Sequence, residues 1–296
     1  MKYYIPQFKL GILSPPQSSA IDKFGGLPWG FPSSKWPFCQ NCGKSMALVA
    51  QLFHHSERLP LGQEGCCLFV FMCSNPEVKP TCVCNTWDSE TGGNTCLLLM
   101  ADELGTGLTY PPDVHNPYTA QLRNAENCSC GDNWDSKRTI WINTEVYVLN
   151  WEEHNDDIPE NFRSAFLKSD VFEVVPRDIG QKSYSGTKLG SVPAWIQSPY
   201  EHIHSFLGQF SDFEFDSPIP TANELGCTIV RGAEGSRYAE DPNRRCLEGP
   251  VAVFEFTSDD QAQSKYWLCN TPNYGDGGMG YIFRTPHSYE FIWQCY

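Results

Sequence analysis

An internal repeat is the sequence feature that most constrains how this chain can fold. The segment Lys23–Trp29 (KFGGLPW) is echoed by Lys188–Trp195 (KLGSVPAW). In each copy an apolar stretch with a glutamine follows, and then a glycine-led aromatic segment. These blocks are Met46–Leu52 and Gly65–Phe71 in the first copy, and Ser205–Phe210 and Gly278–Phe283 in the second. Because the blocks recur in the same order, we predict two related modules produced by internal duplication, near residues 20–150 and 185–296.

Strand-like segments dominate both modules. Runs rich in β-branched and aromatic residues, bounded by Gly, Pro, Asn or Asp, occupy residues 67–72, 138–148, 251–256, 280–283 and 291–295. Helical periodicity is weaker, and residues 158–169 and 199–210 are the two candidate helices. We therefore predict an α+β fold that is sheet-dominated and mostly antiparallel, with two related β-rich modules and few helices.

The boundary between the modules is expected near an acidic stretch. Five acids lie between Glu152 and Glu160, which predicts a solvated loop or linker. We expect residues 1–296 to form a single compact domain whose modules are joined by an acidic and helical segment, 151–184. Isolated β-rich modules would expose strand edges, and exposed edges are normally paired or covered.

A cysteine pattern in the first module predicts a metal site. Cys39 and Cys42 form a C-x-x-C-G knuckle, a spacing that lets two thiolates face one ion. Cys73 follows about thirty residues later, with Cys82 and Cys84 as alternatives for a fourth ligand. Four thiolates would complete a closed tetrahedral site for one structural zinc ion.

Other interpretations of these cysteines stay open. A thioredoxin-like redox pair would require a helix starting at Cys39, and no helical pattern begins there. A site that has lost its metal is also compatible with the stretched spacing. Cys128 and Cys130 could replace Cys82 and Cys84 as ligands. The second module has no C-x-x-C, and a packed core without metal is the simplest account of it.

Charge and termini exclude several classes of protein. The chain has 35 acidic and 21 basic residues, a formal net charge of −14, and no large Lys/Arg cluster. Nucleic-acid binders need basic patches to neutralise phosphates, so we expect no nucleic-acid partner. We find neither a signal peptide nor an 18-residue apolar run, so we expect a cytoplasmic protein without a membrane partner. In a reducing compartment, the 14 cysteines are expected to be metal ligands or buried thiols.

Catalytic signatures are missing from the sequence. It contains no G-x-S-x-G, P-loop, H-E-x-x-H or dinucleotide fingerprint. Asp276 is the most distinctive acidic position, although Asp-Gly is also an ordinary turn sequence. Tyr274, Trp267 and His202 are the other residues that could line a cleft. His202 and His204 could also replace thiolates as metal ligands in the second module, but no downstream Cys/His pair completes that set. We therefore predict no catalytic residues.

Several of these segments together resemble a known family. The chain is similar to YwqG-like proteins, a bacterial-type family of unknown function, in Lys23–Pro28, the Trp36–Gly43 knuckle, Met46–Leu52, Leu68–Cys73 and Gly275–Gly278. The first module also resembles the N-terminal half of programmed cell death protein 2. The resemblance implies an α+β fold of two related halves, with metal ligands Cys39, Cys42, Cys73 and either Cys82 or Cys84. The relatives of programmed cell death protein 2 are similar to dedicated chaperones of a basic ribosomal protein.

Two functions from different classes follow from these observations. The first is a non-catalytic protein-interaction module, chaperone-like or the immunity-type partner of a toxin, stabilised by structural zinc. Its acid excess favours a basic protein partner. The alternative is an enzyme or small-ligand-binding protein with a cleft between the two modules, near Asp276, Tyr274 and His202.

Overall fold

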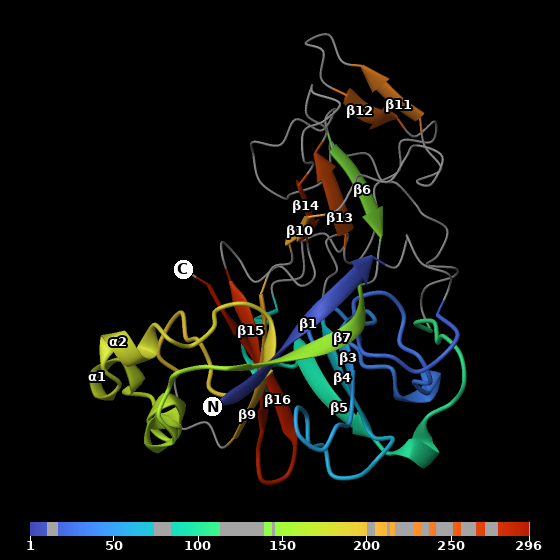
Figure 1. Ribbon diagram of the computed structural model, residues 1–296. Coiled ribbons are helices and arrows are strands. Elements are labelled where there is room, and N and C mark those ends of the chain that lie inside the picture. Colours follow the sequence, from blue (N-terminus) through green and yellow to red (C-terminus); the bar gives the residue numbers. More distant parts are fainter. Residues whose placement is uncertain are drawn as a thin grey trace.

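The computed structural model describes residues 1–10, 17–73, 84–112, 139–143, 146–199, 205–211, 214–216, 228–231, 237–240, 251–255, 265–269 and 278–295. One sheet of ten strands dominates the molecule, in the order β16-β15-β9-β8-β1-β7-β2-β3-β4-β5 (Figure 1). Its strands are β1 (Lys2–Leu10), β2 (Lys23–Phe24), β3 (Ala47–Phe53), β4 (Cys67–Met72), β5 (Asn94–Leu99), β7 (Val146–Asn155), β8 (Lys188–Gly190), β9 (Ser205–Ser211), β15 (Met279–Arg284) and β16 (Tyr289–Gln294). All the pairings between these strands are antiparallel. The prediction of a sheet-dominated, mostly antiparallel fold with few helices is confirmed.

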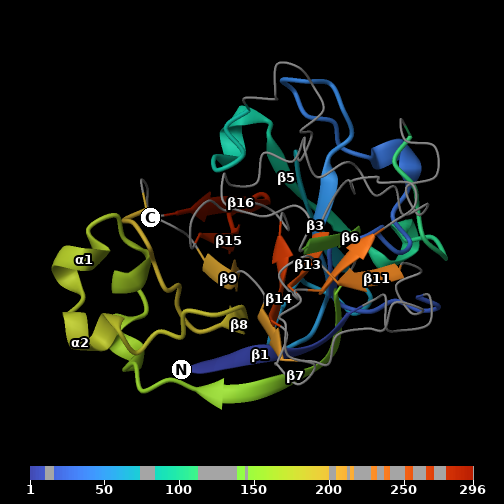
Figure 2. The ribbon, with the colours of Figure 1, turned by 90° about the horizontal axis from the view of Figure 1, so that it is seen from above.

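The ten-stranded sheet curls until its two edges meet. At the junction Trp293 of β16 donates from its indole Nε1 to Thr86 Oγ1 (3.2 Å), and from its backbone N–H to the Trp87 carbonyl (3.3 Å). β16 and β5 lie side by side in both ribbon views (Figure 2). The sheet is therefore nearly closed, and the main core lies on its inner face, where Phe24 and Phe210 meet edge to face.

Strand β4 is buried on both faces. Leu68, Val70 and Met72 enter the main core, while the alternate residues Phe69 and Phe71 enter a second core. The second core is covered by the segment that runs from Leu27 to Met46, with Phe31 and Trp36 packed edge-on against the β4 aromatics. A continuous apolar run is the pattern expected of a strand that has no solvent-facing side. This second core leads directly to the cysteine knuckle.

Both predicted helices are wrong. Residues 158–169 form two 3₁₀ turns, η6 (Glu160–Phe162) and η7 (Ala165–Leu167), and the short helices α1 (Val171–Val174) and α2 (Arg177–Gly180) follow. Residues 205–211 form β9, because burial of Phe206 through Phe210 on both faces outweighs the weak helical period. The expected acidic loop is in part β7, which continues to Asn155. The turns pack a small core of their own around Ile158, Phe166 and Val171.

The remaining elements are small. Further 3₁₀ turns are η2 (Ser33–Lys35), η3 (Ser89–Thr91) and η4 (Ala101–Glu103). A four-stranded sheet, β10-β14-β13-β6, and a two-stranded sheet, β11-β12, lie at one end of the large sheet (Figure 1). Their strands are β6 (Thr139–Asn143), β10 (Glu214–Asp216), β11 (Thr228–Arg231), β12 (Arg237–Glu240), β13 (Val251–Glu255) and β14 (Lys265–Cys269). Among the described residues, no helix has the length and apolar character needed to span a membrane.

Candidate functional site

The C-x-x-C-G motif forms a tight hairpin next to the second core. Phe38 and Ser45 form a β-bridge across it, and the Cys39 N–H donates to the Lys44 carbonyl (2.9 Å). Gly43 closes the turn by donating its N–H to the Cys39 carbonyl (2.8 Å). Its φ of +67° lies in the left-handed region that favours glycine. The turn therefore favours glycine at position 43, and the C-x-x-C-G motif supplies it.

Three cysteines converge at this hairpin. The sulfur atoms of Cys39, Cys42 and Cys73 all lie within 4.8 Å of one another. The Cys42 and Cys73 sulfurs are 3.8 Å apart. Two thiolates bound tetrahedrally to one zinc ion at 2.3 Å would be separated by about 3.8 Å, which follows from the Zn–S bond length. The donor set and its spacing thus fit a thiophilic metal ion, and Cys39, Cys42 and Cys73 could hold one.

Cys84 lies against the same cluster. It packs on the second core together with Cys42. Gly93, whose carbonyl accepts the Cys73 N–H (2.8 Å), is so close to Cys84 that an added Cβ would lie 3.3 Å from the Cys84 Cβ. Gly92 accepts the N–H of Gln40 inside the knuckle (3.1 Å). Cys84 therefore lies near the three cysteines, although its sulfur is not among those that lie within 4.8 Å of one another.

Other residues that the sequence singled out have different outcomes. Cys66 and Cys67 are buried thiols, as predicted. Trp267 lies in β14. Seven residues lie outside the described part of the chain: Cys82, Cys128, Cys130, His202, His204, Tyr274 and Asp276. Whether Cys82 or the 128–130 pair could contribute a ligand, and whether a cleft exists near Asp276, therefore stay predictions.

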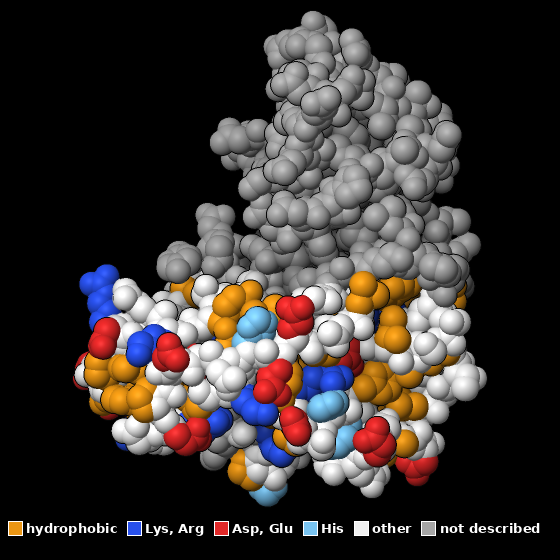
Figure 3. Space-filling model, viewed as in Figure 1, with side chains coloured by type: hydrophobic (Ala, Val, Ile, Leu, Met, Phe, Trp, Pro, Cys, Tyr) orange, Lys and Arg blue, Asp and Glu red, His pale blue; other side chains and the backbone are white. Residues whose placement is uncertain are grey.

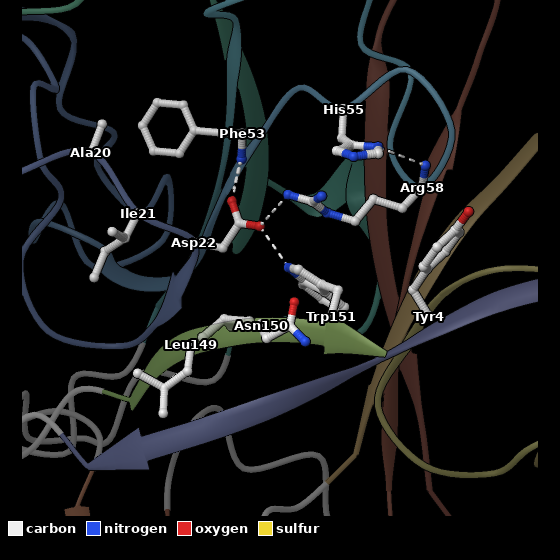
Figure 4. A pocket seen from close by; sticks show the side chains of 11 residues that line it. Tyr4, Ala20, Ile21, Asp22, Phe53, His55, Arg58, Leu149, Asn150 and Trp151 are labelled. Atoms are coloured by element: carbon white, nitrogen blue, oxygen red, sulfur yellow. Dashed lines mark hydrogen bonds and ion pairs between the residues drawn. The ribbon is translucent and has the colours of Figure 1, made fainter. Parts of the chain in front are cut away.

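A second polar site was not predicted. The Asp22 carboxylate accepts three hydrogen bonds, from the Phe53 N–H (2.6 Å), the Trp151 indole Nε1 (2.7 Å) and the Arg58 guanidinium (3.2 Å). Figure 4 shows these groups converging on the carboxylate, with the Arg58 guanidinium above Trp151. The Arg58 Cζ atom lies 5.7 Å from the centre of the Trp151 ring. Burial raises the pKa of Asp22, and the Phe53 hydrogen bond and the Arg58 charge oppose this rise.

A cavity of about 390 Å³ adjoins this cluster. One end is apolar, with Ile21 and Leu149, and the other is polar, with His55, Arg58 and Tyr4 (Figure 4). The Tyr4 hydroxyl lies 3.1 Å from a Glu57 oxygen and 3.3 Å from a Glu153 oxygen. Burial, followed by these two carboxylates, raises the pKa of Tyr4 to about 12.

Sequence separation explains why this cluster was missed. Arg58 and Trp151 stand 36 and 129 residues from Asp22, and no motif links the three. One signal was available, because Asp22 directly precedes the first copy of the repeat, where the second copy has Thr187.

Comparison with models of known protein families finds none that matches this chain, and comparison with curated proteins also finds no match.

Proposed function

We propose that the protein is a non-catalytic protein-interaction module, chaperone-like towards a basic partner, whose first half is held together by one structural zinc ion. The convergence of Cys39, Cys42 and Cys73, with Cys84 beside them, is the observation that carries this proposal. Four thiolates would fill the tetrahedral shell, which leaves no position for a reactive water. The role of the ion is then to stabilise the fold, because ligand binding energy becomes folding energy.

The metal centre would fix two exposed aromatic side chains. Phe38 directly precedes Cys39 and is 46% exposed, and Trp87 stands three residues after Cys84 and is 41% exposed. Aromatic residues are enriched at protein interfaces, and Trp and Tyr are frequent among the side chains that contribute most of the binding energy. We infer that the loops pinned by the ion present part of the contact surface to the partner.

Charge supports a basic partner. The whole chain carries a formal charge of −14, which would steer an oppositely charged protein towards it. On the face drawn in Figure 3, acidic and basic side chains are interspersed among apolar ones rather than gathered in one acidic patch. The expected contribution is therefore to the association rate, with affinity supplied by apolar contacts.

We further propose that the chain is an internally duplicated, YwqG-like protein. In support, Lys23 and Lys188 are both fully buried and pair with Gln51 and Gln209 in the same antiparallel register. Gln51 accepts a hydrogen bond from the Trp29 N–H, and Gln209 accepts one from the Ala194 N–H; each donor lies six positions after the lysine of its copy. Each glutamine also donates to the carbonyl two positions before that lysine, that of Ile21 or Gly186.

Backbone conformation supports the same correspondence. In the first copy Gly25 and Gly26 follow Lys23-Phe24, and in the second copy Gly190 and Ser191 follow Lys188-Leu189. All four have positive φ, between 58° and 83°. Ser191 is the one non-glycine residue with positive φ within the described part of the chain. A non-glycine residue keeps such a conformation only where the surrounding structure imposes it, so the same turn is held in both copies.

Two substitutions at opposite ends of β4 test the metal proposal. Both Cys66 and Cys73 are buried, but only Cys73 belongs to the cluster. We expect Cys73→Ala to lose the bound zinc and to lower the unfolding temperature. Cys66→Ala should retain one zinc per chain, measured by elemental analysis of protein purified without chelator under reducing conditions. A wild-type protein without metal, or equal metal content in both variants, would refute the structural zinc.

The same two variants test the interaction proposal. Immobilised protein should retain one stoichiometric basic protein from a lysate of the native host. Its association rate should fall as salt rises, because exposed charges are screened beyond roughly 8–10 Å. Cys73→Ala should lose this partner, whereas Cys66→Ala should keep it. Retention of the partner by both variants would separate the interaction from the metal centre.

A further inference from the structure

The position of Asp22 has a direct counterpart in the second half of the sheet. Asp22 precedes Lys23, and its carboxylate accepts the N–H of Phe53, two residues beyond the register partner Gln51. Thr187 precedes Lys188, and its hydroxyl accepts the N–H of Ser211 (3.0 Å), two residues beyond Gln209. The two side chains therefore close the same backbone position in the same register.

Thr187 shows that a neutral oxygen is sufficient for that structural task. A carboxylate that is only 6% exposed is expensive to bury, and such a charge is normally retained only with good partners. Asp22 has acquired two, Arg58 and Trp151. The hydrogen bond to the Phe53 N–H at the end of β3 does not require a charged acceptor. The ion pair between Asp22 and Arg58 therefore needs another explanation.

A β-bulge brings Trp151 to the ion pair. Gln7 of β1 pairs with Asn150 and Phe8 pairs with Val148, so Leu149 is an extra residue without a partner. Because side chains alternate along a strand, Val148 and Trp151 would otherwise face opposite sides of the sheet. With the bulge, both pack against the main core, and Leu149 points outward with 65% exposure. Bulges of this kind often lie beside functional sites, where they redirect a side chain.

The hydrogen bonds already made by Asp22, His55 and Arg58 determine which ligand groups the cavity can still bind. Asp22 already accepts three hydrogen bonds, which nearly exhausts its capacity. His55 accepts the N–H groups of Glu57 and Arg58 at Nδ1, which places the proton of the neutral ring on Nε2. Arg58 has five N–H donors and gives one to Asp22. The groups left over on Arg58 and His55 are donors, and the side-chain amide of Asn150, which also lines the cavity, can donate or accept.

The surroundings decide which acceptor fits. Glu57 and Glu153 flank Tyr4 at one end, so an anionic group is favoured at Arg58 and His55 rather than beside Tyr4. Ile21 and Leu149 line the other end and offer apolar contacts. The volume of about 390 Å³ falls within the range of roughly 300–1,000 Å³ that is usual for small-molecule sites.

We propose that this cavity binds a small organic carboxylate with an apolar or aromatic body. Arg58 and His55 contact the carboxylate, and the body lies along Trp151 towards Ile21 and Leu149. Asp22 is a positioning residue: it holds the guanidinium over the indole ring and does not contact the ligand. This site is independent of the metal centre, since none of its residues belongs to the cysteine cluster.

Nuclear magnetic resonance of the Trp151 indole N–H tests the proposal on the full chain. The resonance is assigned by its disappearance in Trp151→Phe. Benzoate is the probe, benzamide is its neutral isostere, and benzylamine is its cationic counterpart. We expect benzoate to shift the resonance saturably and to bind at least tenfold more tightly than benzamide. Equal affinity for the two, tighter binding of benzylamine, or no saturable shift with benzoate would overturn the proposal.

Variants separate binding from folding. Arg58→Gln should abolish the benzoate shift, while Arg163→Gln, at an exposed arginine that pairs with Glu160, should leave it unchanged. If Arg58→Gln unfolds because Asp22 is left unpaired, the double variant Asp22→Thr/Arg58→Gln restores the neutral arrangement of the second half. The double variant should fold, as judged by dispersed indole resonances, and fail to bind benzoate. Benzoate binding by a folded Arg58 variant would refute the assigned role of Arg58.

Discussion

Lys188 is a residue whose burial should be measurable as a pH dependence of stability. Its side chain is fully buried, its Nζ donates a hydrogen bond to Ser183 Oγ (2.8 Å), and the same atom lies 5.6 Å from the centre of the Tyr3 ring. Burial lowers the pKa of Lys188 from 10.5 to about 7, although the Asp156 charge opposes this change. Between these two values the unfolded chain binds a proton that the folded chain does not. The free energy of unfolding should therefore rise with pH across this window, by at most about 1.4 kcal/mol per unit.

Replacing Lys188 with Met isolates this contribution. We expect Lys188→Met to remove a positive slope of stability between pH 7 and pH 10.5, measured by urea unfolding at several pH values. Below pH 7 both states of the wild type are protonated, so the difference between wild type and variant should become constant. Lys182→Met, at an exposed lysine, should leave the slope unchanged. The same slope in wild type and Lys188→Met would mean that Lys188 is charged when buried.

Residues were predictable where chemistry is encoded in local spacing. Cys39 and Cys42 were found because a knuckle needs two thiols three positions apart and a glycine after them. Asp22 and Arg58 were not found, because their pairing depends on a cavity assembled from segments far apart in the sequence. Local sequence therefore predicted a metal site but not a ligand cavity.

Elements were predictable where burial is uniform. The apolar run of β4 was recognised as a strand, since both of its faces are covered. The same uniform burial misled the interpretation of β9, where a short apolar run fits either a strand or a helix. Pairing with β8 and β15 decides the outcome, and pairing partners are not visible in a local pattern.

The loops before and after the short strands β2 and β8 are held by one glutamine each. Gln51 and Gln209 are completely buried, and each bonds backbone groups of two flanking segments. Replacement by Leu leaves those backbone groups buried without partners. We expect Gln51→Leu and Gln209→Leu to lower the free energy of unfolding by a similar amount, roughly 2–4 kcal/mol, in urea titrations. Gln181→Leu, at an exposed glutamine, should change it little, and a large difference between the two buried sites would argue against equivalent halves.

At the scale of the whole molecule, the class of fold was predictable but the strand order was not. The repeat predicted two related modules, near residues 20–150 and 185–296, within one compact domain. In the sheet, however, β1 lies between β7 and β8, and β7 lies between β1 and β2. Strand β1 thus pairs with β8, and strand β7 pairs with β2. Nothing in a local pattern distinguishes a strand that pairs with its neighbours in sequence from one that pairs across the sheet.

This strand order predicts how the chain behaves when it is divided. A cut after residue 138 puts β1 to β5 in one fragment and β6 to β16 in the other. The first fragment then loses both strands that pair with β1, and the second leaves β7 without β1 or β2. Because unpaired edges aggregate or stay disordered, we expect neither fragment to show a cooperative unfolding transition alone. Mixed during refolding, the fragments should form a 1:1 complex with the circular dichroism spectrum of the intact chain. A fragment 1–138 that folds by itself would show that β7 and β8 are dispensable for the strands it contains.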